Sequence, residues 1–274
     1  TDENGNEQWV RSYGGGEDDF IWDVVQTKDG GYISVGETTS FAQSTSSDLW
    51  VVKVNSIGDI EWQKTYGDTE HEVGYSIQQS DDGDYVIAGS YQKPGSQTND
   101  LYLLKLDNNG DKEWEKIIGG EYSDGARSLK ITSDGGYIVA GYTSYYGNEP
   151  NQRDAWLVKF DSSGNITWDS NFDGGGDDNA FSAAGLQDGG YIMTGKTTLD
   201  NGQEAVLLLK TDSDGNEKWK EVFDEGTSST GLSIDTVADT GYIIGGIVDI
   251  PGKTREMLLI KTDVLGKVNF NGCM

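Results

Sequence analysis

Asp134-Gly135-Gly136-Tyr137-Ile138-Val139-Ala140-Gly141 is the clearest copy of a stretch that occurs five times in this chain of 274 residues. The tyrosine of each copy returns at intervals of 51 to 54 residues, at Tyr32, Tyr85, Tyr137, Tyr191 and Tyr242. A fixed period of this size is typical of a repeat architecture, in which each repeat needs its neighbours to bury its apolar faces. The sequence therefore predicts a single repeat domain over residues 1–274.

Three further residue types recur in phase with this stretch. An aromatic residue, a lysine that ends an apolar run and a turn glycine each return about once per period. They are Trp9, Trp62, Trp114, Trp168, Trp219 and Phe270; Lys53, Lys105, Lys159, Lys210 and Lys261; and Gly5, Gly58, Gly110, Gly164, Gly215 and Gly266. These markers divide the chain into repeats of about residues 4–57, 58–109, 110–163, 164–214 and 215–266, with a tail at 267–274.

One repeat, which begins near residue 70, predicts four short strands. Residues 74–80, 85–91 and 101–106 are rich in β-branched, aromatic and other apolar side chains, and residues 111–118 surround Trp114. Glycines at positions 83 and 110 predict tight turns between the first two strands and between the last two. Four strands without a helical period indicate an all-β protein.

Four-stranded repeats arranged around an axis make a β-propeller, so five repeats predict five antiparallel blades. A β-solenoid is the competing architecture, but its coils are usually shorter and lack paired tight hairpins. The turn lengths place the first strand of each repeat at the inner edge of its blade and the tryptophan strand at the outer edge.

The termini decide how such a ring closes. The first tryptophan strand, residues 7–13, precedes any inner strand, so we predict that it pairs in the last blade, whose own strands lie within residues 232–262. This pairing removes an open sheet edge. Residues 266–270 form a weaker sixth copy, and they stay the alternative occupant of the same position.

The chain carries 20 basic and 47 acidic residues, a net charge of −27. Such a surface repels nucleic acid and anionic lipid, so neither is an expected partner. Solubility is the simplest explanation of the charge, and carboxylate sites for divalent cations such as calcium are the alternative. No apolar run of 18 residues predicts membrane insertion, and the one cysteine, Cys273, has no intrachain disulfide partner.

Residues 133–143 read Ser-Asp-Gly-Gly-Tyr-Ile-Val-Ala-Gly-Tyr-Thr, and residues 155–168 continue with Leu-Val-Lys-Phe-Asp and Gly-Asn-Ile-Thr-Trp. This pattern resembles a bacterial and archaeal surface-protein repeat family related to SBBP-type propeller repeats, and the resemblance covers essentially the whole chain. It implies a propeller from a secreted or cell-surface protein and supplies no catalytic residue. No signal-peptide pattern opens the sequence, so we interpret it as a mature or trimmed chain.

In a propeller, the connections between blades and the loops between the second and third strands share one face, where variable loops usually carry function. Two columns of side chains fall in the connections. The first holds Asp19, Glu72, Asp124 and Asp178, then Ser229; the second holds Trp22, Tyr75, Arg127 and Phe181, then Leu232. A ring of carboxylates beside aromatic rings can hold a cation or a sugar. The simpler interpretation is that each acid caps its own turn by accepting backbone N–H groups.

The loops between the second and third strands differ in every repeat. The third of them, residues 144–153, holds Tyr145, Tyr146, Asn148 and Arg153, a combination suited to contact with a sugar or a protein. A decorated surface loop is the alternative interpretation.

Several apparent motifs fail. Residues 212–216 resemble a calcium loop but lack its closing Glu. His71 is the only histidine, which excludes a multi-histidine zinc site, and nothing marks a nucleophile for a Ser-His-Asp arrangement. No cofactor is expected, and calcium is the alternative.

These observations favour a non-catalytic binding or adhesion module of a secreted or cell-surface protein, with a glycan or protein ligand on the loop face. The first alternative is a propeller glycoside hydrolase, which needs two carboxylates about 5–10 Å apart. The second is a structural subunit of an extracellular assembly, in which Cys273 and the C-terminal segment join chains together.

Overall fold

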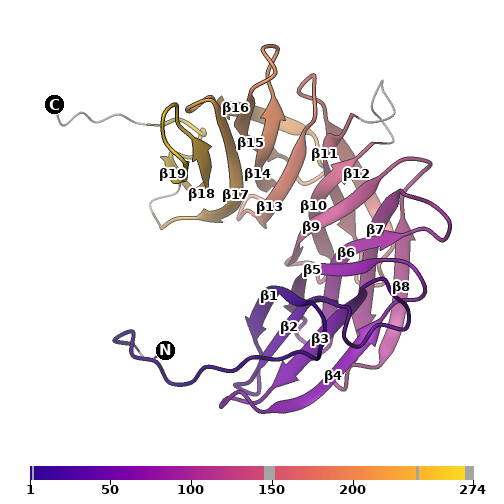
Figure 1. The fold of residues 1–274 in the computed structure, drawn as a ribbon. Coiled ribbons are helices and arrows are strands. Elements are labelled where there is room, and N and C mark those ends of the chain that lie inside the picture. Colours follow the sequence, from indigo (N-terminus) through magenta and orange to yellow (C-terminus); the bar gives the residue numbers. More distant parts are fainter. Residues whose placement is uncertain (2, 145–151, 239–240, 269–274) are drawn as a thin grey trace. The chain divides into compact units, whose positions relative to one another are not determined.

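The computed structural model describes residues 1, 3–144, 152–238 and 241–268. Over these residues the chain forms nineteen β-strands and no helix (Figure 1). The strands make five antiparallel sheets that follow one another along the sequence, one for each predicted repeat. The chain divides into two compact units, unit 1 (Thr1–Gly119) and unit 2 (Gly120–Met274). The prediction of an all-β fold with one sheet per repeat is confirmed.

Unit 1 holds two four-stranded sheets whose strand order follows the chain. The first sheet is β1 (Asp19–Gln26), β2 (Tyr32–Thr38), β3 (Asp48–Val54) and β4 (Ile60–Tyr66). The second sheet is β5 (Glu72–Gln79), β6 (Tyr85–Gln92), β7 (Asn99–Leu106) and β8 (Lys112–Ile118). The first strand and the tryptophan strand therefore lie at opposite edges of each sheet, as predicted.

Unit 2 holds two sheets of four strands and one of three. They are β9 (Asp124–Ile131), β10 (Tyr137–Thr143), β11 (Asp154–Phe160) and β12 (Ile166–Phe172); β13 (Asn179–Gly185), β14 (Tyr191–Thr198), β15 (Glu204–Thr211) and β16 (Glu217–Phe223); and β17 (Ser228–Thr236), β18 (Tyr242–Asp249) and β19 (Arg255–Thr262). None of the described segments is a helix of the length and apolar character needed to cross a membrane.

The Asp-Gly-Gly-Tyr stretch is a turn that neutralises a buried lysine. In the third sheet, the Asp134 carboxylate accepts the N–H of Gly136 (3.0 Å) and pairs with the Nζ atom of Lys159 (2.8 Å). Lys159 is only 5% exposed, and Lys53 of the first sheet pairs with Asp29 at the same distance. A buried ammonium group needs such a partner, so the stretch belongs to the scaffold.

The glycine that ends each stretch lies at a β-bulge. At Gly141 a Cβ atom would lie 1.9 Å from the carbonyl oxygen of Gly125, where the pairing of β10 with β9 shifts register. The equivalent glycines of the other sheets meet a carbonyl oxygen in the same way: Gly36, Gly89, Gly195 and Gly246. A side chain has no room at this position, which explains why glycine recurs.

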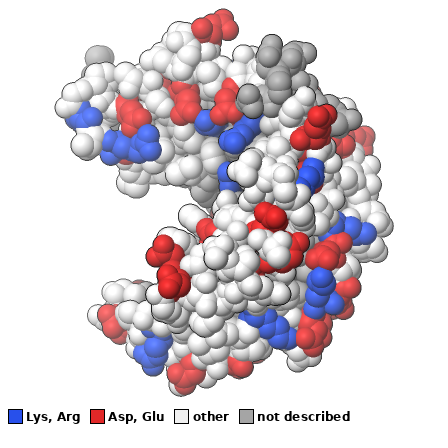
Figure 2. Space-filling view, turned by 45° about the vertical axis from the view of Figure 1, so that its right-hand side comes forward, with Lys and Arg blue, Asp and Glu red and all other residues white. Residues whose placement is uncertain are grey.

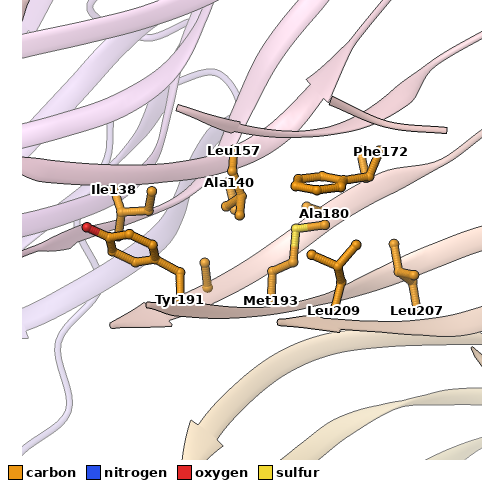
Figure 3. Close-up of a cluster of buried hydrophobic side chains, with 11 residues drawn as sticks. Ile138, Ala140, Leu157, Phe172, Ala180, Tyr191, Met193, Leu207 and Leu209 are labelled. Carbon is orange, nitrogen blue, oxygen red and sulfur yellow. The ribbon is translucent and has the colours of Figure 1, made fainter. Parts of the chain in front are cut away.

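In both units, a hydrophobic core lies between neighbouring sheets. In unit 2, Ile138 and Ala140 of β10 and Leu157 of β11 face Met193 of β14 and Leu209 of β15 (Figure 3). All five side chains are at most 1% exposed. The first two sheets enclose an equivalent cluster in unit 1, which includes Val35, Val51, Ile77 and Leu104.

The N-terminal segment, residues 7–13, packs on the first sheet without forming a strand. The Nε1 atom of Trp9 donates to the Ser56 carbonyl oxygen (3.1 Å), and the Tyr13 hydroxyl donates to the Gly58 carbonyl oxygen (2.7 Å). Side chains of fourth strands make the same contacts on the sheet that follows them: Trp168 with Ser213, and Tyr66 with Gly110. On the first sheet, the segment therefore occupies the place of a preceding fourth strand.

The last sheet has three strands in the described residues rather than the predicted four. Met257 and Leu259 of β19 are 87% and 68% exposed, whereas Val51 and Leu103, at the position equivalent to Leu259, are fully buried. No fourth strand is paired with β19 in the described part of the chain, so closure by residues 7–13 stays a prediction. The competing segment at 266–270 lies partly outside the described residues.

Candidate functional site

Unit 1 has a polar pocket. It lies at the end of its two sheets where the chain crosses from one blade to the next. It lies where β4, β6 and β8 end and where β5 and β7 begin, and its volume is about 400 Å³. This is the face on which the sequence predicts function. The lining consists of Gln43, Thr65, Tyr66, Gly67, Asp68, Glu72, Tyr91, Tyr102, Lys112, Glu115 and Ile117.

Glu72 and Asp48, which we call the unit 1 acid pair, are both fully buried. Both carboxylates flank Gly67, at which a Cβ atom would lie 2.4 Å from Glu72 Oε2 and 2.9 Å from Asp48 Cγ. Glu72 Oε1 and Asp48 Oδ1 have no hydrogen-bond partner in the described structure. Burial, together with the charges of Asp68 and Asp48, raises the pKa of Glu72 to about 7; burial also raises the pKa of Asp48.

Two tyrosines present hydroxyl groups to carboxylates around the pocket. Tyr91 donates to Asp68 (2.8 Å), and Tyr102 donates to Glu115 (2.7 Å), which also pairs with Lys112 (2.8 Å). The two rings lie 5.9 Å apart between centroids. The pKa of Asp68 is lowered, chiefly by the backbone N–H of Glu70. This carboxylate therefore stays ionised at pH values at which Glu72 is protonated.

A second polar group in unit 1 surrounds Glu37. The Nε2 atom of His71 lies 2.9 Å from Glu37 Oε2, to which the Ser47 hydroxyl also donates (2.7 Å). The hydrogen bond with His71 lowers the pKa of Glu37 and raises that of His71. Trp22 also hydrogen-bonds to Glu37 and lies 5.9 Å from Tyr75 between ring centroids. The predicted aromatic residues Trp22 and Tyr75 are therefore neighbours.

The predicted column of acids shares one local contact. Each carboxylate accepts the backbone N–H of the residue four positions earlier: Asp19 from Gly15, Glu72 from Asp68, Asp124 from Gly120, and Asp178 from Gly174. This capping contact is the simpler of the two interpretations of the sequence. A carboxylate oxygen keeps a second lone pair when it accepts one hydrogen bond, so the role of the column in cation binding stays a prediction.

The remaining predicted residues lie in unit 2. Arg127 and Arg153 stand over the ring of the buried Tyr142, with their Cζ atoms 5.4 and 4.5 Å from its centroid. These cation–π contacts give both arginines a structural role. Phe181 lies half-buried on β13, and Tyr145 and Tyr146 lie outside the described residues.

Sequence reasoning found Glu72 but missed the pocket's other side chains. A signal for Tyr91 was present, because the same position of the repeat holds threonine in three other copies: Thr38, Thr143 and Thr197. A large aromatic side chain in a column of threonines marks a place where one repeat departs from the scaffold. Asp68 and Glu115 gave no comparable signal, because exposed acids are common throughout the chain.

Charge is distributed rather than gathered on the face drawn in Figure 2. Asp and Glu side chains are interspersed there with Lys and Arg. Among the described residues, lysines also form ion pairs with acidic side chains, such as Lys64 with Asp111 at 2.7 Å, and such pairs are worth little energy at an exposed surface. The pocket is therefore distinguished by the burial of Glu72 and the adjacent Asp48, and not by the number of its carboxylates.

Comparison with known proteins identifies the fold. No protein-family model matches the chain. It is 28% identical over 138 residues to the regulatory protein FlaEY of Caulobacter vibrioides, a match that covers 43% of this chain and 14% of that protein. It is similar to a solved protein of unknown function from Dyadobacter fermentans, with a TM-score of 0.58, 12% identity, and coverage of 85% of this chain and 73% of that one.

A second solved structure is a putative exo-β-1,3-galactanase from Bifidobacterium bifidum s17. The TM-score is 0.52 at 10% identity, and the match covers 90% of this chain and 88% of that one. At these identities the likeness shows the fold alone. Together with the five antiparallel sheets, it defines the chain as a five-bladed β-propeller.

Proposed function

We propose that this propeller is a binding module whose pocket in unit 1 takes a carbohydrate ligand. A volume of about 400 Å³ is in the range of small-molecule sites. The lining combines tyrosine hydroxyls, carboxylates, an amide and a lysine. Sugars carry many hydroxyl groups that both donate and accept hydrogen bonds, so they match such a mixture.

The partly exposed ring of Tyr91, which packs against the buried ring of Tyr102, is the observation that carries this proposal. An aromatic ring offers an apolar face to the C–H groups of a sugar, while its hydroxyl holds a neighbouring acceptor in place. Here Asp68 and Glu115 are those acceptors. Two ionised carboxylates disfavour an anionic ligand, so we infer a neutral sugar.

The resemblance to surface-protein repeats agrees with a secreted or cell-surface binding module. A protein ligand is the alternative occupant, and an adhesive or assembly role would follow from its identity. These alternatives differ in what they present to the pocket, because a protein would fill it with a side chain instead of a sugar ring.

A glycoside hydrolase is the second candidate, and Glu72 is the specific observation that favours it. A carboxyl group with a pKa of about 7, close to an ionised carboxylate, has the properties of a general acid beside a base or nucleophile. A solved structure of similar fold is described as a putative exo-β-1,3-galactanase. However, Glu72 is fully buried and holds the N–H of Asp68, so we favour binding over catalysis.

A glycan array with the full chain tests the proposal, followed by calorimetric titration and a hydrolysis assay on any bound glycan. Tyr91→Phe and Tyr102→Phe should each weaken binding about fivefold, the equivalent of about 1 kcal/mol for one hydrogen bond. Tyr85→Phe is the matched control, since Tyr85 is a buried tyrosine of the same sheet outside the pocket.

Four results would separate the candidates. Binding without turnover supports the module, whereas turnover that is lost in Glu72→Gln establishes the hydrolase. Binding that survives both pocket variants but disappears when Tyr145 and Tyr146 are replaced would move the site to that loop. Absence of binding to any glycan would contradict the carbohydrate proposal.

A further inference from the structure

Three carboxylates converge in unit 2, outside the pocket described above. Asp154 is the first residue of β11, Asp173 directly follows β12, and Asp178 directly precedes β13. Each can offer one oxygen atom such that all three atoms lie within 4.8 Å of one another. Asp154 and Asp178 are 1% and 0% exposed, whereas Asp173 is exposed.

The cluster lacks a counter-charge. In the described part of the chain, no Lys, Arg or His side chain forms an ion pair with any of the three carboxylates. Asp154 Oδ2 accepts the Nδ2 group of Asn171 (2.7 Å), but its Oδ1 atom is buried without a hydrogen-bond partner. A buried carboxylate oxygen without a partner keeps its full desolvation penalty, which no hydrogen bond offsets.

Asp178 is held in place by the backbone. Its Oδ2 atom accepts the N–H of Gly174 (2.5 Å), and its Oδ1 atom accepts the N–H of Thr198 (3.2 Å). Asp173 is ordered by the N–H of Gly175, which donates to Oδ1 at 2.6 Å. These hydrogen bonds hold the carboxylates of Asp178 and Asp173 close to that of Asp154, although like charges repel at this separation.

We propose that Asp154, Asp173 and Asp178 form a binding site for a divalent cation, and that calcium is the preferred ion. Oxygen atoms that bind calcium at about 2.3–2.6 Å must lie within roughly 5 Å of one another, as these do. Calcium accepts carboxylates in irregular arrangements and completes its shell with water, whereas magnesium demands a near-ideal octahedron. The exposed Asp173 gives the ion its route from solvent.

A proton is the competitor for this site. Burial raises the pKa of both Asp154 and Asp178, so one shared proton would also relieve the repulsion. If the carboxylates share a proton, calcium does not stabilise the folded chain. If they bind a cation, calcium does stabilise it. The two are therefore distinguished by the response of the full chain to calcium at pH 7.5.

The test uses chelator-treated full chain, titrated with CaCl₂ and with MgCl₂ by calorimetry, and melted with and without 2 mM CaCl₂. We expect one calcium site, a rise in Tm of at least about 3 °C, and magnesium binding at least about tenfold weaker. The site shares no residue with the pocket of unit 1, so either proposal can fail without the other.

Asp154→Asn is the decisive variant. It keeps the oxygen that accepts from Asn171 but removes one charge, so its Tm without calcium should equal or exceed that of the unaltered protein. Its calcium-induced rise in Tm should disappear. Asp178→Asn serves as a second variant, and Asp177→Asn is the matched control, since Asp177 pairs with Lys196 (3.1 Å).

Two results would overturn the proposal. One is an unaltered protein whose Tm and calorimetric heat do not respond to 2 mM CaCl₂. The other is a calcium response in Asp154→Asn equal to that of Asp177→Asn, which would place the bound ion elsewhere.

Discussion

Two junctions between neighbouring blades hold a buried acid pair at the same positions of the repeat. Unit 1 has Asp48 and Glu72, and unit 2 has Asp154 and Asp178, which we call the unit 2 acid pair. In both pairs, one acid begins the third strand of a sheet, and the other lies at the start of the first strand of the following sheet. In both, burial raises the pKa of each carboxyl group.

The side chains around the two pairs differ. Unit 1 has a third acid, Asp68, which accepts a hydrogen bond from Tyr91 at the pocket. When the two repeats are aligned, Asp68 lies one position after the place that corresponds to Asp173 of unit 2. Thr197 stands where Tyr91 stands, and its hydroxyl donates to Asp178 instead. The scaffold thus supplies an acid pair at both of these junctions. One or two neighbouring side chains then decide whether the pair borders the pocket of unit 1 or belongs to the compact oxygen cluster of unit 2.

The largest effect on both junctions should come from the bulge glycines. A Cβ atom at Gly89 would lie 1.9 Å from the Val73 carbonyl oxygen, and one at Gly195 would lie 1.8 Å from the Asn179 carbonyl oxygen. These carbonyl groups directly follow the acids Glu72 and Asp178. Gly89→Ala and Gly195→Ala should each lower the free energy of unfolding by about 3 kcal/mol or more, measured by urea denaturation.

Gly185→Ala is the control for this prediction, because a Cβ atom there meets nothing within 4 Å. Its effect should stay within about 0.5 kcal/mol. If only one of the two bulge variants were destabilised, the two junctions would not rest on the same scaffold.

The second prediction concerns pH and the unit 1 acid pair. The pKa of Glu72 is about 7 in the folded chain against an ordinary value of 4.5, so the folded state binds more protons between these values. The free energy of unfolding must therefore fall as the pH rises from 4.5 to 7. A shift of this size corresponds to a loss of about 3 kcal/mol at most.

Glu72→Gln removes this dependence while keeping an oxygen for the N–H of Asp68. We expect the variant to match the unaltered protein at pH 4 and to exceed it in stability at pH 8, measured by urea denaturation at both values. Glu70→Gln, which changes the charge of a nearby acid that is only half-buried, is the control. Equal stability of Glu72→Gln and the unaltered protein at pH 8 would show that Glu72 carries no burial penalty.

The repeat arrangement could be read from the sequence because it depends on local chemistry. The turn at Asp134 and the bulge at Gly141 require particular residues at particular positions, so the period reveals sheets, strand order and the loop face. The acid column was also visible, and so was its capping role. Fourth-strand closure by residues 7–13 was predicted from pattern alone, and the described structure leaves it untested.

The acid pairs were harder to predict, because they join residues of different repeats. A covariation within the chain pointed to them: the third-strand acids Asp48 and Asp154 become Ala205 in the fourth repeat, where the first-strand partner becomes Ser229. Loss of both acids together indicates contact. Arg127 breaks its column for another reason, since it stacks on Tyr142.

The smallest effects should come from the hydroxyl groups that distinguish the two junctions. Tyr91→Phe removes the donor to Asp68, and Thr197→Val removes the donor to Asp178. Each variant should lose about 1 kcal/mol of unfolding free energy in urea denaturation, because one hydrogen bond to a carboxylate is lost. Tyr91→Phe should weaken glycan binding and leave the calcium response intact, and Thr197→Val should do the reverse. Variants that impaired both activities together would mean that the two junctions are coupled, and the division of roles drawn from their neighbours would be wrong.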